Sequence, residues 1–221
     1  MYAIAMSKIW DSELVGRIEK KIGQSLVVIT RPEELTKENL AANNVKKIFF
    51  PHWSHIIKPD IHDSFECVIF HMTDLPFGRG GSPLQNLISR GIYKTKISAL
   101  KCSLGVDTGP VYLKKDLNLD GTAQEIFARA TGIIETMIME ILEKNPVPVE
   151  QTGEVTTFKR RKPEDSNLVL CESLTAIYDY IRMLDAEGYP KAYLEVNGVK
   201  YEFTGARFDG ESIVAQVRIT K

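Results

Sequence analysis

The chain has few cysteines, almost no net charge and no long hydrophobic run. Its 221 residues include three cysteines, and the formal net charge at pH 7 is −1. No apolar stretch approaches the roughly 18 to 20 residues that cross a bilayer. The N-terminus also lacks a charged segment followed by an apolar one, the pattern of a secretion signal. We therefore expect a cytoplasmic protein without a membrane partner.

The cysteine spacing and the charge balance argue against a zinc or redox site and against nucleic acid binding. Cys67, Cys102 and Cys171 are widely separated and form no C-x-x-C pair of the kind found in zinc or redox sites. Cys67 and Cys102 lie in apolar stretches, so we expect them to be buried in the core. A sequence pI near 6.4 argues against a broad basic surface, so a nucleic acid partner is not expected.

Phosphate-binding loops, repeats and metal-ligand clusters are also missing. The stretch HMTDLPFGRGGSP, residues 71–83, contains three glycines but neither G-x-x-x-x-G-K-[ST] nor G-x-G-x-x-G. His52, His55 and His62 fall at mixed spacings without nearby cysteines or paired carboxylates. We expect no metal, and a zinc site on these three histidines is the alternative.

Short apolar runs alternate with helical patterns through the first 145 residues, which is typical of an α/β protein with a largely parallel sheet. The apolar runs predict strands at 2–6, 25–30, 46–50, 67–70, 96–102 and 110–119, the last two close enough to pair antiparallel. The helical patterns lie at 12–22, from Pro83 onward, and at 122–143. In the last of these, Thr122 and Glu125 form the pattern of a capping box. The fold class is therefore α/β, with a Rossmann-like, mostly parallel sheet.

The composition changes after Asn145. Residues 148–172 are polar and lack a helical period, so they are interpreted as a linker. Beyond them, residues 174–184 predict a short amphipathic helix, and apolar and polar residues alternate around Asn197-Gly198, a strong hairpin signal. We predict a catalytic domain at 1–147, a linker at 148–172 and a small α+β appendage at 173–221.

Two segments of the first domain carry candidate chemistry. His71 follows an apolar run and precedes the glycine-rich loop, and Asp107 lies in GVDTGPV, a turn between two predicted strands. Taken singly, both are weak signals. A histidine after a strand is commonly a structural hydrogen-bonding residue, and Asp-Thr-Gly is commonly a plain turn.

Together and in this order, the segments resemble the 10-formyltetrahydrofolate-dependent formyltransferase family. HMTDLPFGRGGSPLQNLI is similar to the family's loop, in which a histidine is followed by Leu-Pro, Arg-Gly and a proline that begins a helix. DTGPVYLKKDLNL is similar to its aspartate turn and outgoing strand. Further similarity lies in WSHIIKPDI, GTAQEIFARA, TFKRRKPEDS and SLTAIYDYIRMLDAEGYPKAYLEVNG. The resemblance covers roughly residues 45–200 and raises the pair to a site hypothesis.

The resemblance implies transfer of a formyl group from 10-formyltetrahydrofolate to an amine, with no metal. His71 would polarise the formyl oxygen or relay a proton, and Asp107 would orient and charge-stabilise His71 and accept the amine proton. The residues that the resemblance places around the folate are Trp53, His55, Ile57, Arg79, Gly80, Leu104 and Val106. For Trp53 and Ile57, simple burial in the core is the alternative.

One position departs from the family pattern. The family places an asparagine, an oxyanion donor, two residues before the histidine, and here that position is Ile69. Loss of such a donor costs on the order of a hundredfold or more in rate. Either backbone amides of the glycine loop or a side chain from residues 52–55 compensates, or the protein is a non-catalytic folate-binding module. We favour compensation because His71 and Asp107 are both present.

The sequence favours a small-molecule acceptor. A methionyl-tRNA formyltransferase would be expected to have a longer C-terminal module and a basic surface, and a purine-pathway enzyme would have a phosphate loop after its first strand. The amino-acid sequence of residues 70–88 most resembles that of sugar N-formyltransferases of the pseudaminic acid type. We therefore expect a nucleotide-linked amino-deoxy sugar as acceptor, with a methionyl-tRNA formyltransferase-like enzyme as the alternative. For the C-terminal hairpin, packing on the first domain and pairing with a second subunit in a homodimer through an exposed strand edge are both open.

Overall fold

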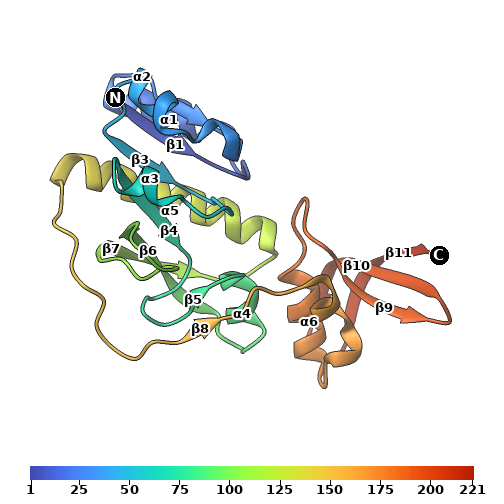
Figure 1. Ribbon diagram of the computed structural model, residues 1–221. Coiled ribbons are helices and arrows are strands. Elements are labelled where there is room, and N and C mark those ends of the chain that lie inside the picture. Colours follow the sequence, from blue (N-terminus) through green and yellow to red (C-terminus); the bar gives the residue numbers. More distant parts are fainter. The chain divides into compact units, whose positions relative to one another are not determined.

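A computed structural model describes residues 1–221 (Figure 1). The strands are β1 (Tyr2–Ala5), β2 (Val27–Ile29), β3 (Lys47–Phe50), β4 (Glu66–His71), β5 (Arg79–Gly80), β6 (Lys94–Lys101), β7 (Val111–Asn118), β8 (Thr157–Phe158), β9 (Ala192–Val196), β10 (Val199–Phe208) and β11 (Ile213–Thr220). The α-helices are α1 (Leu14–Ile22), α2 (Lys37–Ala42), α3 (Pro59–His62), α4 (Pro83–Ile88), α5 (Ala123–Lys144) and α6 (Leu174–Arg182). Three 3₁₀ turns are η1 (Pro32–Glu34), η2 (Pro163–Ser166) and η3 (Leu168–Leu170).

The chain divides into two compact units, each made of separate stretches. Unit 1 comprises Met1–Arg79, Lys96–Leu117 and Ala128–Thr157. Unit 2 comprises Gly80–Thr95, Asn118–Phe127 and Phe158–Lys221. The stretch 148–172, expected to be a linker, contains β8, η2 and η3. No helix is long and apolar enough to cross a membrane.

A six-stranded sheet in the order β2-β1-β3-β4-β6-β7 organises unit 1. Strands β2, β1, β3 and β4 are parallel, and β6 pairs antiparallel with β4, so that His71 lies opposite Ser98. The parallel strands are short and apolar because helices cover both faces, as in doubly wound folds. The expected α/β class with a mostly parallel sheet is confirmed.

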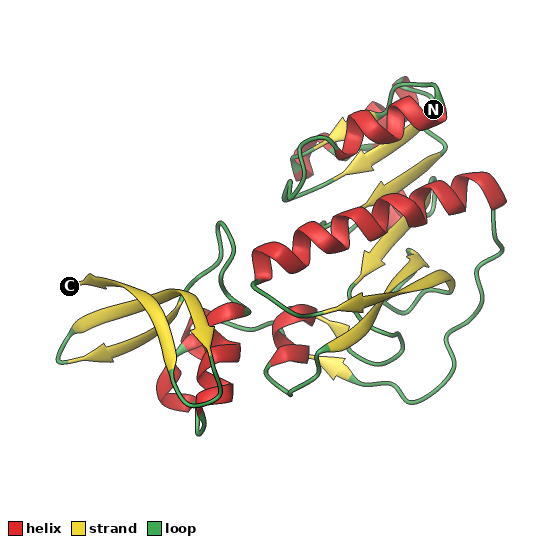
Figure 2. Ribbon diagram, turned by 180° about the vertical axis from the view of Figure 1, so that it is seen from behind, coloured by secondary structure: helices red, strands yellow, loops and turns green.

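Helices pack on both faces of this sheet (Figure 2). On one face, buried side chains from β1 and β3 meet Leu40 of α2 and Ile61 of α3 in one apolar cluster. On the other face, α1 is tied to α5 by Arg17 and Lys21, which both pair with the buried carboxylate of Glu135. Because β1, β3 and β4 are parallel, their carboxyl ends lie at the same end of the sheet, and the loops that follow these strands gather there.

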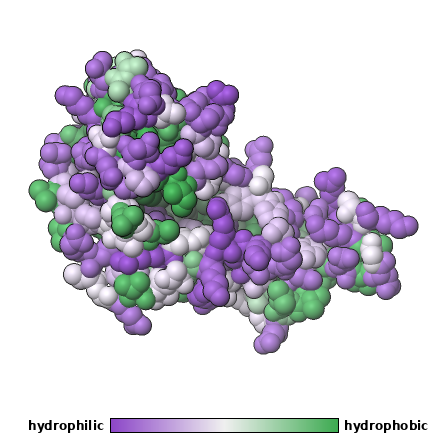
Figure 3. All heavy atoms as spheres, viewed as in Figure 1, coloured by the Kyte–Doolittle hydropathy of each residue, from purple (hydrophilic) through white to green (hydrophobic).

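Unit 2 carries the three-stranded antiparallel sheet β11-β10-β9, with α6 packed against β10 through Tyr178 and Phe208. The predicted hairpin at Asn197-Gly198 is confirmed, since both residues have a positive φ, as a two-residue turn of this kind requires. The predicted capping box is confirmed as well, because Glu125 accepts from the Thr122 backbone amide at 2.8 Å. On the face in Figure 3, hydrophilic side chains predominate and apolar ones gather only in small groups.

Candidate functional site

His71 is the last residue of β4, and its imidazole is 8% exposed. Nε2 lies 2.8 Å from the carbonyl oxygen of Gly78, which can only accept, so the hydrogen of this bond belongs to the ring. Nδ1 lies 3.4 Å from Oδ2 of Asp107. The ring is therefore held between a backbone carbonyl and a carboxylate at the edge of the sheet where parallel strands end.

Asp107 reaches His71 from the turn between β6 and β7, and its side chain is 11% exposed. The residue has φ +53, a left-handed conformation that Asp tolerates better than most residues. The turn also depends on Gly109, because a Cβ there would lie 1.8 Å from the carbonyl oxygen of Lys101. The glycines around Asp107 thus serve the close packing of the turn that points the carboxylate at the imidazole.

Gln151 connects this turn to the glycine-rich loop. Its amide nitrogen donates to the carbonyl oxygens of Asp107 (2.9 Å) and Gly109 (2.8 Å). Its amide oxygen accepts from the Arg79 guanidinium at 2.8 and 3.1 Å. Arg79 therefore helps to fix the Asp107 turn. Sequence reasoning assigned Gln151 to a linker and missed this role, which no local pattern indicates.

Ser98 holds the segment that follows His71. Its hydroxyl is fully buried, donates to the carbonyl oxygen of Thr73 at 2.7 Å and lies 3.3 Å from the backbone amide of Leu75. Lys114 adds a bond to the Asp74 carboxylate at 2.5 Å. The backbone just beyond the imidazole is therefore fixed by side chains of β6 and β7.

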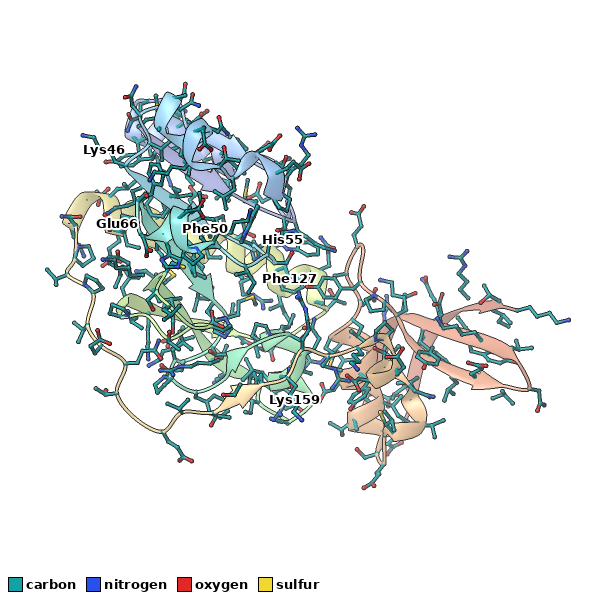
Figure 4. All side chains as sticks on the ribbon, viewed as in Figure 1. Lys46, Phe50, His55, Glu66, Phe127 and Lys159 are labelled. Atoms are coloured by element: carbon teal, nitrogen blue, oxygen red, sulfur yellow. The ribbon has the colours of Figure 1, made fainter.

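Exposed apolar side chains occur in the loops after β3 and β6. Leu104 is 87% exposed, Val106 57% and Ile56 79%. His55 is exposed in the same loop as Ile56, and Figure 4 places it at the opposite end of the sheet from Glu66, which begins β4. Exposed apolar residues next to a buried polar pair are typical of a ligand site.

Two of the predicted folate contacts pack in or against the apolar core cluster. Ile57 is 8% exposed and belongs to the apolar cluster under α2 and α3. Trp53 packs against the same cluster, with ring centroids 5.9 Å from Phe50 and 5.2 Å from His55, but its indole Nε1 is buried without a hydrogen-bond partner. Ile69, at the position of the family's asparagine, packs on this cluster too. Its side chain is apolar and supplies no hydrogen-bond donor.

Gly80 and the histidines of the alternative zinc site each have a contact within the protein. At Gly80 in unit 2, an added Cβ would lie 2.4 Å from the carbonyl oxygen of Phe158, so the glycine allows β5 and β8 to approach closely. His52 bonds to Thr131 at 2.9 Å, and burial lowers the pKa of His52 to about 4. His62 lies beside Asp63 at 2.8 Å. No group of three or more His, Cys, Asp or Glu side chains is placed to hold a metal ion.

A family model and a solved structure that match this chain both carry the name methionyl-tRNA formyltransferase. Residues 163–220 match the family described as methionyl-tRNA formyltransferase, C-terminal domain. A solved structure titled methionyl-tRNA formyltransferase from Clostridium thermocellum is 50% identical, covers 100% of this chain and 98% of its own, and superimposes with a TM-score of 0.96.

Other relatives are more distant. The methionyl-tRNA formyltransferase of Thermosipho melanesiensis is 26% identical over 165 residues, 72% of this chain. This chain spans only 54% of that relative's length. The formyltransferase PseJ from Anoxybacillus kamchatkensis, solved with a formamido sugar nucleotide and tetrahydrofolate, shares the fold at 18% identity and a TM-score of 0.61, covering 80% of this chain and 94% of its own. The expected similarity to sugar N-formyltransferases in particular is not supported, because the more similar proteins carry the methionyl-tRNA name.

Proposed function

Because the chain belongs to the formyltransferase family that includes methionyl-tRNA formyltransferase, we propose that it transfers a formyl group from 10-formyltetrahydrofolate to a primary amine. The observation that carries this proposal is the buried pair of His71 and Asp107, with Nδ1 and Oδ2 3.4 Å apart, at the sheet edge where parallel strands end. Exposed Leu104 and Val106 on the Asp107 turn supply apolar surface for a flat co-substrate.

The chemistry assigns a task to each group. The amine nitrogen forms a bond to the formyl carbon, the formyl oxygen takes up negative charge, and the bond from carbon to N10 of the folate then breaks. Over the whole reaction the amine loses one proton and N10 gains one. His71 would give up its Nε2–H bond to the Gly78 carbonyl when substrates bind and donate to the developing oxyanion or relay a proton, and Asp107 orients the ring and receives the amine proton directly or through water.

Trp53 is our candidate for the donor that Ile69 does not supply. Its indole nitrogen can only donate, is buried, and has no partner within the protein. An unpaired buried donor costs roughly 1–3 kcal/mol, so a ligand acceptor at this position would recover that cost. Backbone amides of the glycine-rich loop are the second candidate. His55, which is exposed beside Trp53, is proposed to contact the folate from the same loop.

Methionyl-tRNA is the acceptor that the comparisons support best. The relative from Clostridium thermocellum carries that name at 50% identity over the whole chain, and residues 163–220 match a C-terminal domain of the same description. This replaces the amino sugar as the first expectation, and it makes nucleic acid a candidate partner. Because this chain covers about half of the Thermosipho relative, the acceptor stays a proposal.

One observation keeps the amino sugar as a second candidate. Residues 158–221, which include the matched C-terminal domain, contain ten basic and ten acidic residues, so this region has no net charge. Proteins that bind RNA through its backbone ordinarily concentrate positive charge on the binding surface. A nucleotide-linked amino-deoxy sugar would not need such a surface.

An acceptor comparison tests the proposal. Purified protein is incubated with 10-formyltetrahydrofolate and, separately, with charged initiator methionyl-tRNA, with uncharged tRNA and with a set of nucleotide-linked amino sugars, and formylated product is measured. The proposal predicts formyl-methionyl-tRNA, none with uncharged tRNA, and a rate that falls with added salt. Formylated sugar alone would establish the second candidate. No product with any amine, despite saturable folate binding, would indicate a non-catalytic folate-binding module.

Two further expectations from the sequence belong with this proposal. Location in the cytoplasm would place the protein with its folate co-substrate and is tested by cell fractionation. A homodimer is tested by sedimentation or light scattering of the purified chain. Neither affects the roles proposed for His71 and Asp107.

A further inference from the structure

Residues 149–156 form an extended segment, the strap, between α5 and β8 (Figure 1). At one end, Val149 exchanges two backbone hydrogen bonds with Val111 at the start of β7, at 2.8 and 2.9 Å. At the other end, the carbonyl oxygen of Thr156 accepts from the backbone amide of Arg79 at 2.9 Å. The strap therefore connects the strand that leaves the aspartate turn with the glycine-rich loop.

One strap side chain contacts the candidate site. Most strap residues are exposed, but Gln151 is partly buried. Its amide nitrogen donates to the carbonyl oxygens of Asp107 and Gly109, and its amide oxygen accepts two hydrogen bonds from the guanidinium of Arg79. An amide side chain has two donor hydrogens and two acceptor lone pairs, so all four bonding positions of Gln151 are occupied.

Arg79 determines which way the Gln151 amide faces. A guanidinium has donors only, so the amide oxygen must point to Arg79 and the amide nitrogen to the two backbone carbonyls. A reversed amide would place its NH₂ group against the guanidinium and its oxygen against two other oxygens. Arg79, Gln151 and the Asp107 turn therefore form one chain of contacts, in which each member fixes the next.

The Asp107 turn depends on support from outside. Asp107 has φ +53, a conformation that most residues other than glycine avoid. Leu104 and Val106 in the same turn are largely exposed, so burial of their side chains does little to hold it. The Gln151 bonds reach the turn at the backbone of the residue that carries the carboxylate.

We propose that Gln151, oriented by Arg79, is a positioning residue that holds the Asp107 carboxylate against the His71 imidazole. This inference deepens the proposed function and rests on it, because that contact is the one assigned to formyl transfer. Oδ2 and Nδ1 are 3.4 Å apart, already longer than most N–H···O hydrogen bonds. A small shift of the turn therefore separates the two groups.

The kinetics of Gln151→Glu test the proposal, with the acceptor that is formylated in the acceptor comparison. The new carboxylate has the same size and still accepts from Arg79, but both donors to the turn are lost. We expect kcat to fall about tenfold or more, because a misplacement of about 1 Å costs up to about a hundredfold. Gln151→Met, which is neutral and similar in length, should show a similar fall. Gln24→Glu, the same change at an exposed position before β2, should leave kcat unchanged.

A double variant distinguishes positioning from a general loss of stability. If Gln151 acts through Asp107, adding Gln151→Glu to Asp107→Asn should lower kcat by less than about twofold further, because the supported contact is already lost. A loss multiplied in full would overturn the proposal, and so would wild-type kcat in both Gln151 variants. Circular dichroism of each variant confirms that it is folded.

Amide hydrogen exchange tests the positioning without formyl transfer. The backbone amides of Lys101 and Val111, on either side of the turn, are hydrogen-bonded. In Gln151→Glu, a peptide covering residues 101–111 should exchange faster than in the wild type, and a peptide covering β1 should not change. If this difference appears in a protein that formylates no amine, the proposed function fails and Gln151 still fixes the turn. Unchanged exchange would show that Gln151 does not position Asp107.

Discussion

The two sheets of this protein differ in how deeply their strands are buried. In the six-stranded sheet of unit 1, Ile4, Ile48 and Val68 are fully buried. In the three-stranded sheet of unit 2, by contrast, Val214 is 69% exposed, Val217 47% and Ile219 62%. The candidate chemistry is attached to the deeply buried sheet. A polar pair such as His71 and Asp107 can be held in fixed geometry only where the backbone that carries it cannot move.

Removing core volume from the unit 1 sheet should have the largest effect on stability. Phe49 is 1% exposed and has ring neighbours Tyr2 and Phe70 at 6.5 and 6.4 Å. We expect Phe49→Ala to lower the free energy of unfolding by about 3–5 kcal/mol, because it removes a buried ring and leaves a cavity. Denaturant unfolding measures this loss, and a change below about 1 kcal/mol would contradict the burial described for unit 1.

The partly buried imidazole of His52 should make unit 1 sensitive to acid. Burial lowers its pKa in the folded protein to about 4, below the ordinary value of 6.5. The unfolded chain therefore binds the proton more readily, so stability should be complete above pH 6.5 and fall as the pH drops towards 4. The full effect is about 3 kcal/mol. In urea unfolding between pH 7 and 4, the free energy of unfolding should decline less in His52→Asn than in the wild type. Asparagine is chosen because it tolerates the positive φ at this position. An identical decline would assign the acid sensitivity to other groups.

A smaller loss is expected at Ser98, where the buried hydroxyl fixes the segment after His71. Ser98→Ala should cost about 1–3 kcal/mol, because it leaves a buried carbonyl and a buried amide without partners. Formyl transfer should also fall, since the backbone behind the imidazole loosens. Ser64→Ala, at an exposed position before β4, is the matched control and should change neither property. Wild-type activity in Ser98→Ala would show that this contact is not needed for positioning.

The smallest effect is expected in the unit 2 sheet. Ile219 on the edge strand β11 is 62% exposed, so Ile219→Ser should change the free energy of unfolding by less than about 0.5 kcal/mol. Denaturant unfolding of the purified chain measures this. A loss above about 1 kcal/mol, especially one that depends on protein concentration, would mean that another chain covers this strand in solution.

Sequence patterns predicted those parts of the fold that depend on near neighbours. The capping box at Thr122 and the turn at Asn197-Gly198 involve residues close in sequence, and both were found as expected. Gln151 was missed because it bonds to the carbonyl of Asp107, 44 residues away, and to Arg79, 72 residues away. Composition describes its segment only as polar.

The candidate site itself came from family resemblance and not from periodicity. His71 and Asp107 are 36 residues apart, and nothing in either stretch alone indicates that Nδ1 and Oδ2 lie 3.4 Å apart. The same resemblance named Ile57 for the folate, with burial in the core as the alternative; its side chain lies in the core under α2 and α3, and its contact with folate stays a prediction. An apolar residue beside a pocket and an apolar residue beneath it have the same sequence signature.

We propose that His71 and Asp107 act as one unit in formyl transfer, and variants of both residues test this most directly. We would measure formyl transfer by wild type, His71→Asn, Asp107→Asn and the double variant, with whichever acceptor the acceptor comparison yields and with circular dichroism of each. Each single change should reduce kcat/KM by about a hundredfold or more, and the double variant should lose little beyond that, because residues acting as one unit are not additive. Near wild-type rates in His71→Asn, or fully multiplied losses in the double variant, would contradict the account.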